Sequence, residues 1–414
     1  MPPITLLKDK RIVLGATGSI AVYKAIDLAS KLTQVGALVD VVMSESAQRF
    51  VSPLTFQAVT GRPVYTDMWL TDNSGGLPTH IAHVGLGEGA DLLAVIPATA
   101  NTMAKLAQGM SDDLLSVIAL AARCPIVLAP AMDGGMYEHP ATQANVTKLI
   151  ERGATIIEPE EGRFASGLYG RGRLPEREML IGQIRRVLGR EGALAGKHVV
   201  VSAGPTREAF DPVRFISNHS SGKQGYAIAQ AALDAGADVT LISSVDLPAP
   251  VGATIVKIDS ANDLLNAVKT VLPSADALIM AAAVADFRPA TRAEQKIKKQ
   301  TNNDDAMQID LARNPDILKE VYAMRADVPQ LKVVVGFAAE SENLLTNAQS
   351  KVERKGLDFI VANDISATDA GFAVDNNRVV FLHKDGTQEQ FDLMSKALVA
   401  EQIIIRVAER LSDS

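Results

Sequence analysis

The sequence predicts two α/β domains, each built around a doubly wound, mostly parallel sheet. Its 414 residues are enough for two or three domains with separate cores. In each half, short apolar runs alternate with segments of helical periodicity, which is typical of strands joined by helices that cover both faces of a sheet. The pattern restarts near residue 197, after a segment at 186–196 that carries glycine and charge. We therefore expect one domain at 1–189 and a second at 190–414.

The chain begins with a predicted strand, a glycine turn and a helix. The apolar run at 11–14 is followed by GATGS and by an amphipathic stretch at 20–34. Gly36 closes this helix, and an apolar strand at 39–43 completes a right-handed βαβ unit. Two more strands and two more helices continue the alternation: strands at 92–96 and 126–129, and helices at 99–108 and 114–122.

The second half is predicted to follow the same order. A strand in GKHVVVSAG leads to a helix that starts near Gln224, through a segment rich in Arg, Asn, Ser and Gly. This segment has about twenty residues, and a loop of that length inside a compact domain is uncommon unless it is functional. The alternative is a purely structural loop. A further apolar strand, ADALIMAAAVADF, is expected to end at Asp286.

Composition excludes several classes of protein. Apolar residues make up 47% and charged residues 21%, which argues against a disordered or fibrous chain. The net charge of -7 opposes broad attraction to nucleic acid or to an anionic membrane. The single cysteine, Cys124, excludes a disulfide framework and a multi-cysteine metal site. With no leader-like segment at the N-terminus and no unbroken spanning stretch, we expect a cytoplasmic protein.

The first glycine turn is a candidate phosphate site. Gly15, Thr17, Gly18 and Ser19 follow a strand and open a helix, where backbone amides can approach an anion. The spacing lacks the three glycines of a dinucleotide fingerprint, and no acidic residue follows the second strand to hold a ribose. A mononucleotide such as FMN therefore fits better than NAD. The alternative is a tight turn that binds nothing.

More polar residues are expected at the carboxyl edge of the same sheet, where open α/β folds bind ligands. Ser44 ends the second strand, and Asp133 follows a later one. His83 lies in a predicted loop and is a candidate base near neutral pH, although a lone histidine is more often a surface or capping residue. The strand before Asn101 contributes the remaining candidate cofactor contacts: Pro97, Thr99, Asn101 and Thr102.

The second half offers a candidate triphosphate site. Asp286 is followed by the lysines of QKIKKQ, including Lys296. A carboxylate beside clustered lysines can hold magnesium and neutralise a leaving pyrophosphate. The alternative is a solvated charged face. The pair Gly222 and Lys223 is not a Walker A loop, because glutamine follows it and the upstream glycine is missing.

The motifs GATGSIAVYK, PATANT, SDDLL, PAMDGGMY and ASGLYGRGR resemble those of the flavoprotein cysteine decarboxylases. In particular, residues 8 to 185 resemble the decarboxylase half of the bifunctional phosphopantothenoylcysteine decarboxylase/phosphopantothenate–cysteine ligase family. The resemblance implies a flavodoxin-like domain in which FMN oxidises the cysteine end of the substrate before carbon dioxide leaves. His83 matches the catalytic histidine of that family.

Three residues depart from the family pattern. Asp133 replaces the asparagine of PAMNxxM, which places a carboxylate beside a substrate that is itself a carboxylate unless Asp133 is protonated. Ser166 stands where the family's clamp carries a proton-donating cysteine, and Asp112 replaces the asparagine of the NDL motif. Both Asp133 and Ser166 are nevertheless expected at the catalytic centre.

The motifs VSAGPTREAFDPVRFISNHSSGK, AAAVADFRPA, EQKIKKQ, NPDIL, VVGFAAE and LDFIVANDIS resemble the ligase half of the same family over residues 197 to about 400. The resemblance implies a Rossmann-like domain in which CTP activates phosphopantothenate as an acyl-cytidylate before cysteine displaces CMP. Asn218 would stabilise the acyl-cytidylate, Arg214 would hold a substrate phosphate or carboxylate, and Lys296 would be the catalytic lysine. The expected nucleotide-binding set is Met280, Ala281, Ala282, Asp286, Lys296, Pro315, Asp316, Ile317, Leu318, Phe337, Lys351 and Lys355, with Asp286 also at Mg2+. As alternatives, Pro315 can simply start a helix, and Lys351 and Lys355 can form a solvated helix face.

Taken together, the residues and the resemblance predict a bifunctional enzyme of coenzyme A biosynthesis that uses FMN, Mg2+ and CTP. Its partners would be small molecules, namely 4'-phosphopantothenate, cysteine and CTP, with no nucleic acid and no membrane. The family's trimeric decarboxylase and dimeric ligase domains imply a homo-oligomer, a dodecamer. One alternative is an active ligase fused to a flavin-binding domain with impaired decarboxylation. Another is a non-catalytic flavoprotein regulator.

Overall fold

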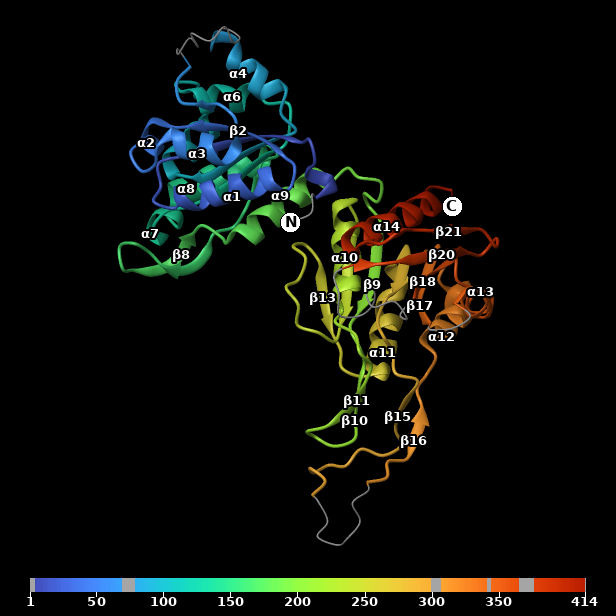
Figure 1. The fold of residues 1–414 in the computed structure, drawn as a ribbon. Helices are drawn as coiled ribbons and strands as arrows, with labels where there is room; N and C mark the ends of the chain where they lie inside the picture. The colour runs from blue at the N-terminus through green and yellow to red at the C-terminus, as the bar shows by residue number, and fades with distance from the viewer. Residues whose placement is uncertain (1–3, 69–78, 299–306, 341–343, 365–375, 414) are drawn as a thin grey trace. The chain divides into compact units, whose positions relative to one another are not determined.

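The computed structural model describes residues 4–68, 79–298, 307–340, 344–364 and 376–413. The chain divides into two compact units, Met1–Gly189 and Arg190–Ser414 (Figure 1). Within the described residues, no helix is both long and apolar enough to cross a bilayer.

The first unit is a parallel sheet of six strands in the order β3-β2-β1-β4-β5-β6. The strands are β1 (Arg11–Ala16), β2 (Leu38–Met43), β3 (Val64–Tyr65), β4 (Leu92–Ala98), β5 (Ile126–Pro130) and β6 (Thr155–Ile156). A separate antiparallel hairpin joins β7 (Glu160–Arg163) to β8 (Tyr169–Arg173). The helices are the 3-10 turn η1 (Thr5–Leu7), α1 (Val22–Gln34), α2 (Glu45–Gln48), α3 (Pro53–Thr60), α4 (Thr79–Glu88), α5 (Ala100–Gln108), α6 (Leu114–Ala121), α7 (Gly134–Tyr137), α8 (Pro140–Glu151) and α9 (Arg177–Gly189).

Helices cover both faces of this sheet, as the sequence predicts. Side chains of α1, α3 and α9 pack with alternate residues of β1 and β2 into one core. Side chains of α4, α5, α6 and α8 pack with the intervening residues into the other. Gly36 follows α1 with a φ of 103°, a left-handed conformation that glycine adopts without strain, and the chain then enters β2. The predicted βαβ start is therefore confirmed.

The loop predicted around His83 is wrong, because His83 lies on helix α4. The glycines at 85, 87 and 89 disfavour a helix, but packing overrides that preference. A Cβ added to Gly87 would lie 2.9 Å from Cβ of Ala121 on α6, so glycine is what allows the two helices to approach closely.

The second unit contains an eight-stranded sheet in the order β13-β12-β9-β14-β17-β18-β20-β21. The strands up to β18 are parallel, and β20 and β21 add an antiparallel edge. The strands are β9 (His198–Ala203), β12 (Asp238–Ser243), β13 (Thr254–Lys257), β14 (Ala277–Met280), β17 (Val333–Glu340), β18 (Phe359–Asp364), β20 (Val379–His383) and β21 (Gln388–Gln390). Three short antiparallel pairs lie outside it: β10 (Arg207–Ala209) with β11 (Phe215–Ser217), β15 (Phe287–Pro289) with β16 (Leu311–Arg313), and β19 (Asn376–Asn377) with β22 (Met394–Ser395).

Helices again cover both faces. The helices are α10 (Lys223–Asp234), α11 (Ala261–Val271), η2 (Leu272–Ser274), α12 (Ile317–Met324), η3 (Arg325–Asp327), α13 (Leu344–Lys355) and α14 (Lys396–Ser412). Helices α10 and α14 pack on one face, and α11, α12 and α13 pack on the other. The predicted mostly parallel α/β class is therefore confirmed for this unit as well.

Two local predictions in this unit are corrected. Strand β14 ends at Met280, six residues before Asp286, because the small alanines that follow allow the chain to leave the sheet and bond to the β9 side. There, the amide of Ala282 donates to Oγ of Ser202 at 3.1 Å, and the amide of Ala283 donates to the carbonyl of Gly204 at 2.9 Å. The long connection after β9 is not a plain loop either, since it contains the β10–β11 hairpin, which extends beyond the sheet alongside β15 and β16 (Figure 1).

Candidate functional site

The turn after β1 is held by hydrogen bonds to the end of β4. Thr17 is fully buried, and its hydroxyl donates to the carbonyl of Pro97 at 2.6 Å and accepts from the amide of Thr99 at 3.0 Å. Gly15 is also buried, and a Cβ there would lie 2.7 Å from Cδ1 of Leu115. The side chains of Thr17 and Pro97, with Gly15, therefore form the scaffold beneath this edge, and the approach of their backbone to a cofactor stays a prediction.

The accessible polar residues of this edge lie at helix starts. The hydroxyls of Ser44 and Thr99 cap α2 and α5 by accepting from backbone amides at 3.2 and 3.3 Å. Helix α1 has Ala21 at its N-cap and no side-chain cap, so its positive end is left to other partners. Gly18, Ser19, Asn101 and Thr102 complete the edge, each at least partly exposed. Hydroxyls and amides at a helix start are the donors that a phosphate requires, so this set fits FMN.

Asp133 and Ser166 meet in a cavity of about 360 Å³, here called the Ser166 cavity, which Ser19 and Lys24 also line. Oγ of Ser166, in the turn of the β7–β8 hairpin, donates to Oδ2 of Asp133 at 2.8 Å. The other carboxylate oxygen accepts from the amide of Gly135 at 3.3 Å and caps α7. Asp133 therefore caps α7 and also lines the cavity.

The structure does not bring His83 to this pair. Within the described residues, His83 is not among those lining the Ser166 cavity, and its helix α4 packs against α6. Asp112, the third departure, pairs with Nζ of Lys105 at 2.9 Å, and Asp113 pairs with the same ammonium at 2.8 Å. The hydrogen bonds that the Lys105 ammonium donates to Asp113 and Asp112 raise the pKa of Lys105.

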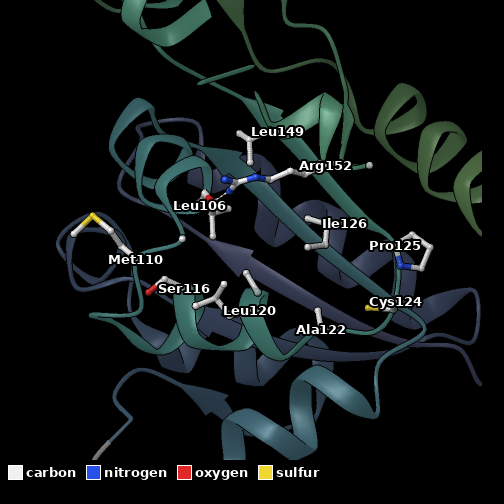
Figure 2. Close-up of a pocket in the computed structure, with 14 residues that line it drawn as sticks. Leu106, Met110, Ser116, Leu120, Ala122, Cys124, Pro125, Ile126, Leu149 and Arg152 are labelled. Atoms are coloured by element: carbon white, nitrogen blue, oxygen red, sulfur yellow. Dashed lines mark hydrogen bonds between the residues drawn. The ribbon is translucent and has the colours of Figure 1, made fainter. Parts of the chain in front are cut away.

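A second cavity of about 300 Å³ lies at the opposite end of β5 (Figure 2). Its lining is mostly apolar, and Arg152 extends into it toward Leu106, where Nη1 of Arg152 donates to the carbonyl of Ala107 at 2.9 Å. Cys124 lies here, and burial raises the pKa of its thiol. Since β5 separates Cys124 from Asp133, this cysteine cannot replace the clamp cysteine within the chain.

The second unit has a cavity of about 430 Å³ at the carboxyl edge of its sheet, here called the Asn218 cavity. The loop from Asn218 into α10 forms one wall, and the chain leaving β14 at 281–284 forms another. Phe337 and Ala338 of β17 contribute a third. Nδ2 of Asn218 donates to the carbonyl of Ala283 at 3.3 Å, which joins the first two walls.

Arg214 is engaged within the chain. Its Nε and Nη2 donate to Oδ2 of Asp211 at 3.0 and 2.6 Å, and Nη2 also donates to the carbonyl of Ile297 at 3.0 Å. The same carboxylate oxygen accepts from the amide of Ile297 at 3.2 Å. Asp211 thus attaches the segment that carries Lys296 to the β10–β11 turn. A substrate anion at Arg214 stays a prediction, because these contacts show only an internal partner.

The remaining predicted residues separate into two groups. Asn218, Ala281, Ala282 and Phe337 come together at the Asn218 cavity. Met280 and Ile317 are 5% and 3% exposed, so a nucleotide could meet only their backbone. Asp316 caps α12 and pairs with Nζ of Lys355 at 3.2 Å, close to Pro315 and Leu318 at the same helix start. Lys351 lies one turn before Lys355 on α13.

Asp286 and Lys296 are exposed and lie outside the walls of the Asn218 cavity. In the part of the chain that the structure describes, no three His, Cys, Asp or Glu side chains group as metal ligands. Asp286 could still take part in Mg2+ binding, because that ion is often held by one or two carboxylates together with substrate phosphates.

Beyond the motif NHSSGK, the cavity has four polar residues that were not predicted: Gln224, Asn363, Asn377 and Lys396. Asn363 lies one residue before the end of strand β18, and its position in LDFIVANDIS was a signal that could have been used. Asn377 and Lys396 carry no local signal, since only the tertiary fold brings them to this edge.

Comparison with known proteins covers nearly the whole chain. Residues 3–189 match the family described as Flavoprotein, and residues 194–411 match the DNA/pantothenate metabolism flavoprotein C-terminal domain. The coenzyme A biosynthesis bifunctional protein CoaBC of Bacillus subtilis is 46% identical over 97% of this chain and 98% of its own length. That of Mycolicibacterium smegmatis is 44% identical over 96% and 97%. A crystal structure of the C-terminal domain of a CoaBC protein is 38% identical and covers 54% of this chain and all of its own, with a TM-score of 0.46.

Proposed function

The chain belongs to the family of bifunctional coenzyme A biosynthesis proteins, and from that premise we propose how its two activities divide between its two units. The protein is an enzyme with phosphopantothenate–cysteine ligase and phosphopantothenoylcysteine decarboxylase activities. We assign the decarboxylase to residues 1–189 and the ligase to 190–414. The observation that carries this division is that each unit has its own core and its own polar cavity at the carboxyl edge of its sheet.

In the ligase, the carboxylate of 4'-phosphopantothenate attacks the α-phosphorus of CTP, and pyrophosphate leaves. The amine of cysteine then forms a bond to the acyl carbon, the bond from that carbon to the cytidylate oxygen breaks, and the amine releases a proton. Asn218, held by the carbonyl of Ala283, lies where its amide can contact the acyl-cytidylate. Lys296 supplies a positive charge to the triphosphate, and Asp286 would hold Mg2+, which neutralises phosphate charge when bound.

In the decarboxylase, FMN would bind through the hydroxyls and amides at the starts of α1, α2 and α5. When bound, it supplies the two-electron oxidation and the later reduction that the decarboxylation requires. Ser166 and Asp133 share a hydrogen bond at the cavity where substrate would lie. Asp133 accepts the hydroxyl of Ser166 at the position where the family's asparagine offers an amide donor. His83 would act as the base.

We further propose that the decarboxylase site is shared between copies of the chain. This proposal is supported by the position of His83, which lies on α4 and does not line the cavity of Asp133 and Ser166 in the same chain. A neighbouring copy that presents its His83 to this cavity would complete the site. The resemblance to trimeric decarboxylases and dimeric ligases agrees with this homo-oligomer.

The two alternatives, an impaired decarboxylase domain and a non-catalytic flavoprotein regulator, are not favoured, because bifunctional coenzyme A biosynthesis proteins match nearly the whole chain. Asp133 and Ser166 are hydrogen-bonded to one another, and Asp133 also caps α7, so the pair has a structural role as well.

The test is to incubate the full chain with 4'-phosphopantothenate, cysteine, MgCl2 and CTP, and to identify products by mass. We expect phosphopantothenoylcysteine followed by 4'-phosphopantetheine. Accumulation of the first product alone would contradict the decarboxylase activity of residues 1–189. Absence of both products would contradict the proposed function.

A further inference from the structure

The Asn218 cavity contains three buried amide oxygens that lack a hydrogen-bond partner within the described part of the chain. They are Oε1 of Gln224, Oδ1 of Asn363 and Oδ1 of Asn377. All three side chains line this one cavity. Asn363 and Asn377 are 8% and 3% exposed, so bulk solvent does not satisfy them.

A buried carbonyl oxygen without a donor is costly, and folded proteins keep few of them. Three at a single cavity therefore indicate an absent group that carries several N–H or O–H donors. Lys396, also buried at 7% exposure, adds a positive charge to the same lining. The site thus offers acceptors for a nitrogen donor and a cation for an anion.

These residues lie apart from the α12 and α13 members of the expected nucleotide set, whereas Ala281, Ala282 and Phe337 of that set line the same cavity. On β18, Val361 belongs to the core under α10 and α14, and Ala362 belongs to the core under α11, α12 and α13. Alternation along the strand then directs Asn363 to the α10 and α14 side. Gln224 belongs to the same side, since its Nε2 donates to the carbonyl of Lys396 at 3.1 Å and joins α10 to α14. The candidate nucleotide residues of α12 and α13 lie on the other face.

We propose that Gln224, Asn363, Asn377 and Lys396 form the subsite for cysteine, the α-amino acid that the ligase joins to phosphopantothenate. This inference rests on the proposed ligase function. The amide oxygens accept hydrogen bonds from the amino group of cysteine, and the ammonium of Lys396 faces its carboxylate. The thiol lies against the apolar wall of Phe337 and Ala338.

The geometry also places this amine next to the reaction. Asn218 and Ala283 line the same cavity and are hydrogen-bonded to one another, so an amine held by the orphaned oxygens has its acyl partner within the same enclosed space.

The test uses Asn363→Leu and Asn377→Leu in the full chain, with Asn376→Ala as the matched control. Asn376 neighbours Asn377 on strand β19, is exposed and does not line the cavity. Pyrophosphate release without cysteine reports the first half-reaction. CMP release against cysteine concentration gives the KM for cysteine. We expect each leucine variant to raise that KM about tenfold or more, because a site built to bond N–H groups loses its acceptor. Pyrophosphate release and the KM for CTP should stay at the wild-type values.

Three results would overturn the proposal. An unchanged KM for cysteine would mean that the amides bind only water. A raised KM for CTP instead would assign them to the nucleotide. A fall in pyrophosphate release equal to the fall in CMP release would indicate a purely structural role for the amides. Asn377→Asp keeps acceptor oxygens and should retain the KM for cysteine within a few-fold. If the wild type releases no pyrophosphate from CTP and phosphopantothenate, the proposed ligase function itself fails.

Discussion

Asp211 holds the segment that carries Lys296, and we expect Asp211→Asn to lower ligase turnover through that lysine. The carboxylate accepts from the amides of Val213 and Arg214 at Oδ1, and from Ile297 and the Arg214 guanidinium at Oδ2. An asparagine keeps one acceptor oxygen, so the bonds within the turn survive and those to Ile297 and the guanidinium are lost. Lys296 directly precedes Ile297, so it loses its fixed position.

The expected loss can be bounded. A misplacement of about 1 Å at a catalytic group costs on the order of a hundredfold in rate. Removing the lysine charge altogether, as in Lys296→Ala, costs on the order of 3 kcal/mol, or more than a hundredfold. Asp211→Asn should therefore reduce turnover by roughly tenfold to a hundredfold, and never by more than Lys296→Ala.

The assay is single-turnover pyrophosphate release from CTP and phosphopantothenate, measured for Asp211→Asn, Lys296→Ala and the double variant. If Asp211 acts by positioning Lys296, Asp211→Asn has no further effect once the lysine is gone. If Asp211→Asn lowers turnover by the same factor with and without Lys296, this reasoning is refuted. Full activity of Asp211→Asn would refute it as well. The control is Lys257→Ala, which removes the lysine of an exposed ion pair with Asp246 and should leave turnover unchanged.

Four further outcomes follow from the structure. The variants His83→Asn and Ser166→Ala should each be inactive as decarboxylases. When the two are unfolded, mixed in equal amounts and refolded together, about one quarter of wild-type activity should return, because each shared site has even odds of an intact residue from each copy. If no activity returns, both residues belong to the site of one chain. Asn377→Leu should keep or raise the free energy of unfolding, by about 1 kcal/mol, since it removes an unsatisfied buried amide; a clear fall in urea denaturation would contradict this. The hydrogen bonds from Arg214 hold the pKa of Asp211 well below its usual range. The ionised Asp211 therefore stabilises the fold above about pH 4, and this stabilisation is lost only as pH falls through the lowered pKa. The unfolding temperatures of wild type and Asp211→Asn should accordingly differ by a constant amount between about pH 6 and 9. Asp133→Asn should raise the rate of decarboxylation of synthetic phosphopantothenoylcysteine, because an amide does not repel the substrate carboxylate; an unchanged or lower rate would reject the charge argument.

The alternation of apolar strands and amphipathic helices was sufficient to predict both sheets, because the periodicity that buries a helix face is local in sequence. Helix α4 was missed because its glycines weaken the local signal, while its close approach to Ala121 is a tertiary contact. The end of β14 was missed for a related reason: the alanines after Met280 are as apolar as the strand, and only their bonds to the β9 side show that the chain has left the sheet.

The candidate sites were predicted where one motif supplies several residues, as in the turn from Asn218 into α10. Residues that converge from distant segments could not be found in this way. Asn363, Asn377 and Lys396 lie on three separate elements, and their shared property, a buried polar group at one cavity, exists only in the folded chain.

The most direct test of the two-unit account is a product analysis of two variants in the full chain. Lys296→Ala should form almost no phosphopantothenoylcysteine from CTP, cysteine and phosphopantothenate, yet should convert supplied phosphopantothenoylcysteine to 4'-phosphopantetheine at the wild-type rate. His83→Asn should do the reverse and accumulate phosphopantothenoylcysteine. If either single substitution abolishes both reactions in a folded protein, or if Lys296→Ala impairs decarboxylation of the supplied intermediate, the division of the activities between the two units is contradicted.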